Sequence, residues 1–227
     1  MSRTRIKICG LTRPEDVAAV VAAGADAIGF VFYPKSPRYV TPQQAASLMA
    51  GLPPYVSTVG LFVNASVEEV QQTLAAAPLS LLQFHGDETP EHSAVLAAAV
   101  NRPYNQVFRV RPDTSFADLL EYEQRYRAAS PLFSSLLLDT YVDAYGGAGK
   151  AFDWSLIPEE LAPRVVLSGG LSVQTATEAV VQVRPYAVDI SSGVEASKGI
   201  KDASRIRAFV AAVLQADAII AKGLHHD

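Results

Sequence analysis

Residues 5–32 read RIKICGLTRPEDVAAVVAAGADAIGFVF, and this stretch decides how the chain folds. It begins and ends with a short apolar run, Arg5–Cys9 and Ala27–Phe32, each typical of a strand buried on both faces of a parallel sheet. An Ala- and Val-rich segment near residues 14–23 predicts a helix between them, and Gly24 falls where that helix should stop. The stretch therefore predicts a strand, a helix and a second, parallel strand.

The same alternation continues along the rest of the chain. Further apolar runs predict strands at Thr58–Val63, Leu79–Phe84, Gln106–Val110, Leu132–Asp139, Arg164–Ser168 and Ala187–Ser191. Helix candidates lie near residues 42–51, 67–76, 90–100, 116–129, 154–160, 173–183 and 203–215. Eight such repeats in 227 residues, with no linker, favour a closed (β/α)8 or TIM barrel over a doubly wound sheet. We expect one α/β domain over residues 1–227, with eight parallel strands inside an outer ring of helices.

Capping chemistry marks several of the predicted helix starts. Thr12, Thr41 and Ser66 each precede a Glu or Gln by three residues, which is the capping-box pattern. Pro42 and Pro90 fall at first helical positions, where a missing N–H costs nothing. These signals support the helix boundaries.

Two segments depart from the repeat. The Gly-rich stretch Thr140–Phe152 is too long for a plain connection, and it predicts a mobile lid. Residues 216–227 end in two histidines and an aspartate, and we expect a C-terminal extension of the last helix or a frayed tail.

Composition and charge restrict the class of protein. Hydrophobic residues make up 49% and charged residues 19%, which allows a large core and argues against disorder. With a net charge of −4, the chain lacks the excess positive charge that attracts nucleic acid or an anionic membrane. A lone cysteine excludes an intramolecular disulfide and fits a reducing compartment, and no apolar leader or membrane-spanning run is present. We expect a cytoplasmic protein.

Two loops indicate a phosphate site at the mouth of the barrel. In this architecture the active site is built at the C-terminal ends of the strands, and phosphate binds after strands seven and eight. Ser168-Gly169-Gly170 follows the seventh strand, and Ser191-Ser192-Gly193 follows the eighth. One Gly-Gly pair alone fits a tight turn, but two such loops at the expected strands favour an anion cradle of backbone N–H groups. The predicted phosphate-binding residues are Gly169, Gly170, Ser192 and Gly193.

Cys9 and Asp139 are the candidate acid–base groups. Alternation along the first strand turns Lys7 and Cys9 toward the barrel interior. Cys9 is either a buried small hydrophobe or a thiol that ionises beside Lys7 and the anion site, and spacing favours neither. Asp139 ends the apolar run Ser135–Leu138, where a carboxylate is costly unless it is paired or functional.

Three further side chains lie near the same end of the barrel. Lys7 and Asp189 lie on strands one and eight, which are neighbours in a closed barrel, and they predict an internal ion pair with a structural or orienting role. Arg38 is either a clamp for a carboxylate or a solvated surface arginine. His85 is the single histidine at a predicted strand end. No spaced cluster of His, Cys and carboxylates appears, so we expect no metal.

Eight blocks of this sequence resemble the phosphoribosylanthranilate isomerase family. They occur in order over nearly the whole chain, at Lys7–Thr12, Gly29–Tyr39, Val59–Asn64, Leu82–Gly86, Leu138–Thr140, Gly146–Trp154, Ser168–Leu171 and Asp189–Glu195. The resemblance implies an isomerase of tryptophan biosynthesis, which is part of aromatic amino acid biosynthesis. Its reaction is the Amadori rearrangement of N-(5-phosphoribosyl)anthranilate to 1-(2-carboxyphenylamino)-1-deoxyribulose 5-phosphate.

The resemblance also implies roles for individual residues. Cys9 is the general base, Asp139 is the general acid, and Arg38 holds the anthranilate carboxylate. An apolar setting is expected to keep Asp139 protonated, so that it can donate to the furanose ring oxygen. Lys7, His85 and Asp189 are expected to support the site. The chemistry requires no cofactor, and the expected partner is a small phosphorylated substrate, bound by a monomer or a homodimer.

Other functions remain open at this point. A ribulose-phosphate epimerase would need metal-binding histidines. An indole-3-glycerol-phosphate synthase would need a catalytic lysine and additional carboxylates at the strand ends. The related histidine-pathway isomerase typically has an aspartate where Cys9 stands. A non-catalytic barrel that binds phosphorylated ligands would keep the phosphate loops but would have no use for Cys9 together with Asp139.

Overall fold

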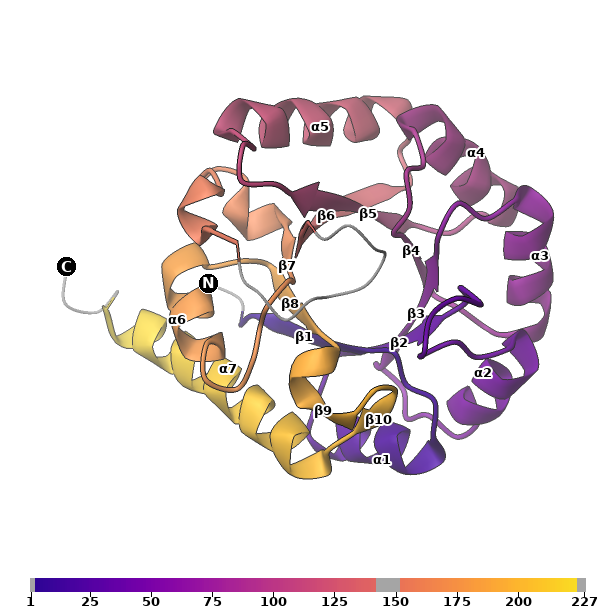
Figure 1. Cartoon of the computed structure of the whole chain (residues 1–227), viewed down its shortest axis with the longest axis horizontal. Coiled ribbons are helices and arrows are strands. Elements are labelled where there is room, and N and C mark those ends of the chain that lie inside the picture. Colours follow the sequence, from indigo (N-terminus) through magenta and orange to yellow (C-terminus); the bar gives the residue numbers. More distant parts are fainter. Residues whose placement is uncertain (1–2, 142–151, 224–227) are drawn as a thin grey trace.

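Eight parallel strands close into a barrel, and the helices surround it (Figure 1). The computed structural model describes residues 3–141 and 152–223. Most of the predicted lid, residues 142–151, and the end of the tail, residues 224–227, lie outside the described residues.

The strands pair in chain order. They are β1 (Arg5–Cys9), β2 (Ala27–Val31), β3 (Ser57–Phe62), β4 (Leu81–Phe84), β5 (Tyr104–Val110), β6 (Phe133–Thr140), β7 (Val166–Leu167) and β8 (Ala187–Ile190). β1 closes the barrel by pairing in parallel with β8, so that Lys7 lies opposite Asp189. This confirms the predicted (β/α)8 barrel, and the predicted strand bounds agree with the observed ones to within two residues.

The outer ring consists of α1 (Pro14–Ala22), α2 (Pro42–Met49), α3 (Val67–Ala76), α4 (Pro90–Val100), α5 (Phe116–Ala129), α6 (Ala176–Val183) and α7 (Ala203–Gly223). The last helix extends to Gly223, beyond the predicted residue 215. None of the described helices is long and apolar enough to cross a membrane.

The helix predicted near residues 154–160 does not form. Two short 3-10 turns, Trp154–Leu156 and Ala162–Arg164, occupy this region instead. Pro158 lacks an N–H and disfavours helical geometry in the residue before it, and Ile157 is accordingly extended. The prediction of a helix near residues 154–160 is therefore wrong, because Pro158 lies inside that range.

The capping predictions succeed for two helices and fail for one. Thr41 and Ser66 both form complete capping boxes, and Pro42 and Pro90 lie in the first turns of α2 and α4. Thr12 is not a cap, because its hydroxyl donates to the carbonyl oxygen of Gly199 at 2.7 Å. Gly199 lies in a hairpin that was not predicted, formed by β9 (Glu195–Ser197) and β10 (Ile200–Lys201). The hairpin lies beside α1 in Figure 1.

The two faces of β1 have different surroundings. Ile6 and Ile8 are buried in the main core between the strands and the helices. Cys9 belongs to a separate apolar cluster with Val31 and Leu61 at the mouth of the barrel. The predicted alternation along the first strand is therefore confirmed, and it places the side chain of Cys9 inside the barrel.

Candidate active site

A cavity opens at the C-terminal ends of the strands and encloses about 760 Å³, part of it open to solvent. The polar residues of its lining include Cys9, Arg38, Gln83, His85, Asp139, Ser168, Gly169, Gly170, Asp189, Ser192 and Gly193. The fold therefore brings the predicted site residues to one cavity, with Lys7 buried beneath them.

Cys9 lies at the end of β1 and is 4% exposed. The neighbouring strand makes room for it with Gly29, where an added Cβ would lie 2.7 Å from Cys9 Sγ and 3.2 Å from Lys7 Cε. Burial raises the pKa of the Cys9 thiol above its ordinary value, and the ammonium groups of Lys7 and Lys201 only partly offset that rise. Burial thus favours the protonated thiol, and the nearby cations favour the thiolate.

The predicted ion pair between Lys7 and Asp189 is confirmed. Lys7 Nζ lies 2.9 Å from Asp189 Oδ1, and both side chains are only 6% exposed. Lys7 Nζ also donates to Gln83 Oε1 at 2.9 Å. Burial lowers the pKa of Lys7, but the charges of Asp189 and Cys9 raise it by more, so that the net shift is upward. Lys7 is therefore a buried cation with fixed partners.

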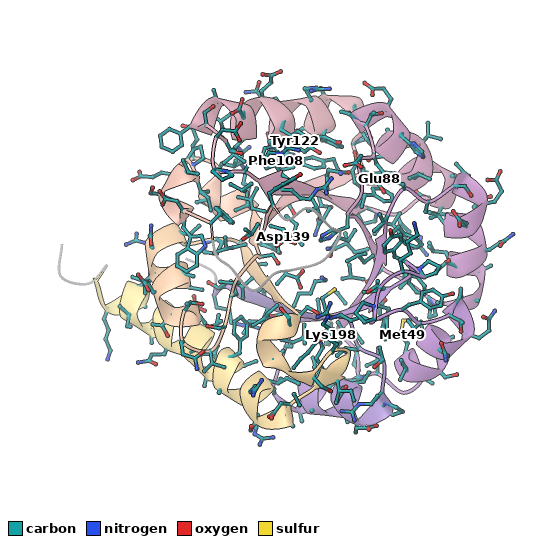
Figure 2. The ribbon with its side chains drawn as sticks, in the orientation of Figure 1. Met49, Glu88, Phe108, Tyr122, Asp139 and Lys198 are labelled. Atoms are coloured by element: carbon teal, nitrogen blue, oxygen red, sulfur yellow. The ribbon has the colours of Figure 1, made fainter. Side chains whose placement is uncertain are left out.

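Asp139 lies within the ring of strands, near its centre in Figure 2. Its Oδ1 accepts a hydrogen bond from the backbone N–H of Thr140 at 2.8 Å, and its Oδ2 lies 3.4 Å from His85 Nε2. The expected apolar setting is therefore wrong for the carboxyl group itself. The preceding Leu138 faces the helices and the main core, whereas Asp139 turns inward to polar neighbours, because side chains alternate along a strand.

Arg38 is not a solvated surface arginine. Its Nε and Nη2 donate to the two carboxylate oxygens of Glu195 at 2.7 and 2.8 Å, and its side chain is 14% exposed. Lys201 Nζ reaches the same carboxylate at 2.9 Å. Burial raises the pKa of Glu195, but Arg38 and Lys201 lower it by more, so that Glu195 stays ionised. The guanidinium is thus held at a fixed orientation at the cavity wall.

Glu195 and Gln83 are functional candidates that sequence reasoning missed. Glu195 lies in the unpredicted hairpin, and its partner Arg38 is 157 positions away in the chain. Alternation along β4 places Gln83 and His85 on the same face. An amide two residues before a strand-end histidine is the sequence signal that points to Gln83.

The two predicted phosphate loops are neighbours at the cavity wall, because they follow the adjacent strands β7 and β8. Gly169 and Gly170 have φ of +75° and +67°, a backbone conformation that favours glycine. An added Cβ at Gly169 would lie 2.5 Å from the backbone nitrogen of Thr140, and one at Gly193 would lie 2.3 Å from the carbonyl oxygen of Leu171. Glycine is therefore required by conformation at Gly169 and Gly170 and by close packing at Gly169 and Gly193, and both loops line the cavity.

Within the described parts of the chain, no group of three or more His, Cys, Asp and Glu side chains could hold a metal ion. The chemistry available among these residues is that of a thiol, a carboxyl group and an imidazole around a cavity that also contains a guanidinium and two glycine-containing loops. A thiol, a carboxyl group and an imidazole can all transfer protons to or from a small substrate.

Comparison with known proteins identifies close relatives. Residues 6–212 match the family model described as N-(5'phosphoribosyl)anthranilate (PRA) isomerase. The chain is 68% identical over 218 residues to the N-(5'-phosphoribosyl)anthranilate isomerase of Herminiimonas arsenicoxydans, covering 96% of each chain. It is 56% identical to that of Pseudomonas fluorescens, covering 94% of this chain and all of the relative.

Solved structures agree with the sequence relatives. The phosphoribosyl anthranilate isomerase of Thermotoga maritima superposes with a TM-score of 0.82 at 40% identity, covering 93% of this chain and 99% of the other. A phosphoribosyl anthranilate isomerase in complex with reduced 1-(o-carboxyphenylamino)-1-deoxyribulose 5-phosphate superposes with a TM-score of 0.79 at 38% identity, with the same coverage. With matches of this extent in both sequence and structure, the chain belongs to the N-(5'-phosphoribosyl)anthranilate isomerase family.

Proposed function

We propose that the cavity at the barrel mouth catalyses the Amadori rearrangement of N-(5-phosphoribosyl)anthranilate to 1-(2-carboxyphenylamino)-1-deoxyribulose 5-phosphate. Family membership gives the reaction. The observation that carries the proposal is that Cys9 and Asp139 line one cavity together with Arg38 and both glycine loops. The ligand bound by the related isomerase carries a phosphate and a carboxylate, which are the two anionic groups that this cavity suits.

The first step opens the sugar ring. Asp139, in its protonated form, gives its proton to the furanose ring oxygen as the bond between that oxygen and C1′ breaks. The lone pair of the anthranilate nitrogen forms the C1′=N bond, giving a protonated Schiff base. The carboxylate left on Asp139 accepts the N–H of Thr140 at 2.8 Å, which stabilises the negative charge as it develops.

The second step moves the double bond. The Cys9 thiolate removes the proton from C2′, the electrons of that bond form C1′=C2′, and those of the C=N bond return to nitrogen. The resulting enolamine tautomerises to the 2′-ketone. The ammonium groups of Lys7 and Lys201 favour the thiolate against the cost of burial, and the substrate is held in place while the proton moves.

The phosphate and the carboxylate of the substrate bind to different groups of the cavity wall in this proposal. The phosphate lies against the backbone N–H groups of the loops at Gly169–Gly170 and Ser192–Gly193. Arg38 is held by Glu195 through Nε and Nη2 and presents the Nη1 side of its guanidinium to the anthranilate carboxylate. Such a fixed clamp loses little side-chain freedom when substrate binds.

A single buried cysteine suits a reducing compartment, and we place the protein in the cytoplasm. We expect a monomer or a homodimer, and a related isomerase from Thermotoga maritima is described as dimeric.

The test is turnover of N-(5-phosphoribosyl)anthranilate generated immediately before use. We expect the anthranilate fluorescence to change as substrate is consumed, and the product to match authentic 1-(2-carboxyphenylamino)-1-deoxyribulose 5-phosphate by mass and NMR. A folded protein that binds phosphate but leaves intact substrate unchanged would contradict the proposal and favour a non-catalytic phosphate-binding barrel.

A further inference from the structure

A chain of polar side chains begins at Lys7 in the barrel interior, continues along the wall of the cavity and ends at Asp139. Lys7 Nζ donates to Gln83 Oε1 at 2.9 Å, and Gln83 Nε2 lies 3.1 Å from His85 Nδ1. On the other side of the ring, His85 Nε2 lies 3.4 Å from Asp139 Oδ2. Gln83 is 1% exposed, so its amide is confined to these partners inside the barrel.

The chemistry of each group fixes the direction of the next hydrogen bond. Lys7 is an ammonium paired with Asp189 and can only donate, so the Gln83 atom that faces it is the carbonyl oxygen. The amide nitrogen of Gln83 therefore faces His85, and it too can only donate. Nδ1 of His85 must then be the accepting, unprotonated nitrogen. In the neutral ring the single proton lies on Nε2, which faces Asp139.

We propose that Gln83 is a positioning residue that fixes His85 as an Nε2–H donor to Asp139. This inference rests on the proposed function, in which Asp139 transfers its proton to the ring oxygen of the substrate. The proton of His85 stays on Nε2 throughout, and the bare Nδ1 is occupied by Gln83. His85 therefore does not accept the proton of Asp139, and it stabilises the carboxylate that remains after the transfer, together with the N–H of Thr140.

The tautomer of His85 can be observed without any turnover. In protein labelled with 15N at its four histidines, the His85 ring signals are assigned by their loss in His85→Gln. We expect neutral His85 of the wild type to carry its proton on Nε2. In Gln83→Glu the new carboxylate can only accept, and we expect a proton to appear on Nδ1. A proton on Nδ1 in the wild type, or the same protonation in both proteins, would overturn the proposal. Because this result needs no substrate, it is independent of whether the proposed function holds.

Kinetics test the consequence for the reaction. Losing a hydrogen bond to a charged group reduces kcat by roughly tenfold to 100-fold. We expect this reduction in Gln83→Leu, with KM changed by less than about threefold. Gln106→Leu is the matched control, because Gln106 is an equally buried amide, on β5, that accepts from Ser93 instead.

Two outcomes of the kinetic test go against the proposal. They are an equal reduction of kcat in the two glutamine variants, and an effect of Gln83→Leu confined to KM. If Gln83→Leu does not fold, His85→Gln and His85→Leu provide the same test. His85→Gln keeps an N–H donor and should retain the higher kcat, so equal kcat values in these two variants would also overturn the proposal.

Discussion

At the scale of single residues, two effects shift the pKa of Cys9 in opposite directions. Its near-complete burial favours the neutral thiol, whereas Lys7 and Lys201 favour the thiolate. Burial is the larger effect, so that the pKa of Cys9 lies above that of an ordinary thiol. A thiol with a raised pKa is mostly protonated at neutral pH. Its thiolate has a high proton affinity, which suits removal of a proton from carbon.

The shifted pKa predicts how Cys9 reacts with iodoacetamide as pH changes. Only the thiolate reacts, so the rate should rise with pH and reach its midpoint above the ordinary thiol range of about 8–9. The same chain unfolded in denaturant is the control, and its midpoint should lie within that range. Since Cys9 is the one cysteine of the chain, alkylation reports on it alone. A folded-state midpoint at or below that of the unfolded chain would contradict this description of the site.

At the scale of elements, the hairpin of β9 and β10 holds the cavity wall. Glu195 and Lys201 belong to it, and the two residues together fix the guanidinium of Arg38. The hairpin is itself tied to the start of α1, because Asp16 accepts the backbone N–H of Lys201 at 3.1 Å. The orientation of Arg38 therefore depends on a segment far from it in sequence.

We predict that Glu195→Gln weakens substrate binding more than it slows the reaction. The amide cannot accept both donors of Arg38 or balance two cations, so Arg38 loses its orientation. We expect KM to rise roughly tenfold and kcat to change by less than about threefold, measured by steady-state kinetics. Lys198→Ala, an exposed change in the same hairpin, is the control and should leave both constants unchanged. A lower kcat at unchanged KM in Glu195→Gln would place Glu195 in the chemical step instead.

Sequence reasoning was accurate for elements with strong periodicity and failed where local chemistry overrides it. The strands and the helices from α2 to α5 were predicted closely, because long apolar runs and capping residues act locally. The helix near residues 154–160 failed because Pro158 prevents it. The hairpin at Glu195–Lys201 was missed because only partners distant in sequence, such as Arg38, account for its polar residues.

At the scale of the whole molecule, closure of the barrel creates the site. β1 and β8 meet only when the barrel closes, and this places Lys7 opposite Asp189. The pairing of these two residues was predicted from topology alone. The contact between His85 and Asp139 was not, because it depends on how side chains from β4 and β6 approach across the interior, which strand order does not determine.

The buried pair at the closure point predicts a non-additive stability effect. Lys7→Met and Asp189→Leu each leave one buried charge unpaired, and each should lower the free energy of unfolding by about 3–5 kcal/mol. The double variant leaves neither charge and should be more stable than either single variant. Urea denaturation followed by circular dichroism measures all three. Single variants as stable as the wild type, or a double variant with the sum of the two losses, would contradict this role of the pair.

We propose that Cys9 and Asp139 act as base and acid on one substrate in this cavity. The most direct test of this claim is the turnover of freshly generated N-(5-phosphoribosyl)anthranilate by wild type, Cys9→Ala and Asp139→Asn, followed by anthranilate fluorescence. We predict rapid turnover by the wild type and a loss of about 100-fold or more in kcat for each variant, with both variants folded. Near wild-type turnover by either folded variant would contradict the claim and require a different acid or base.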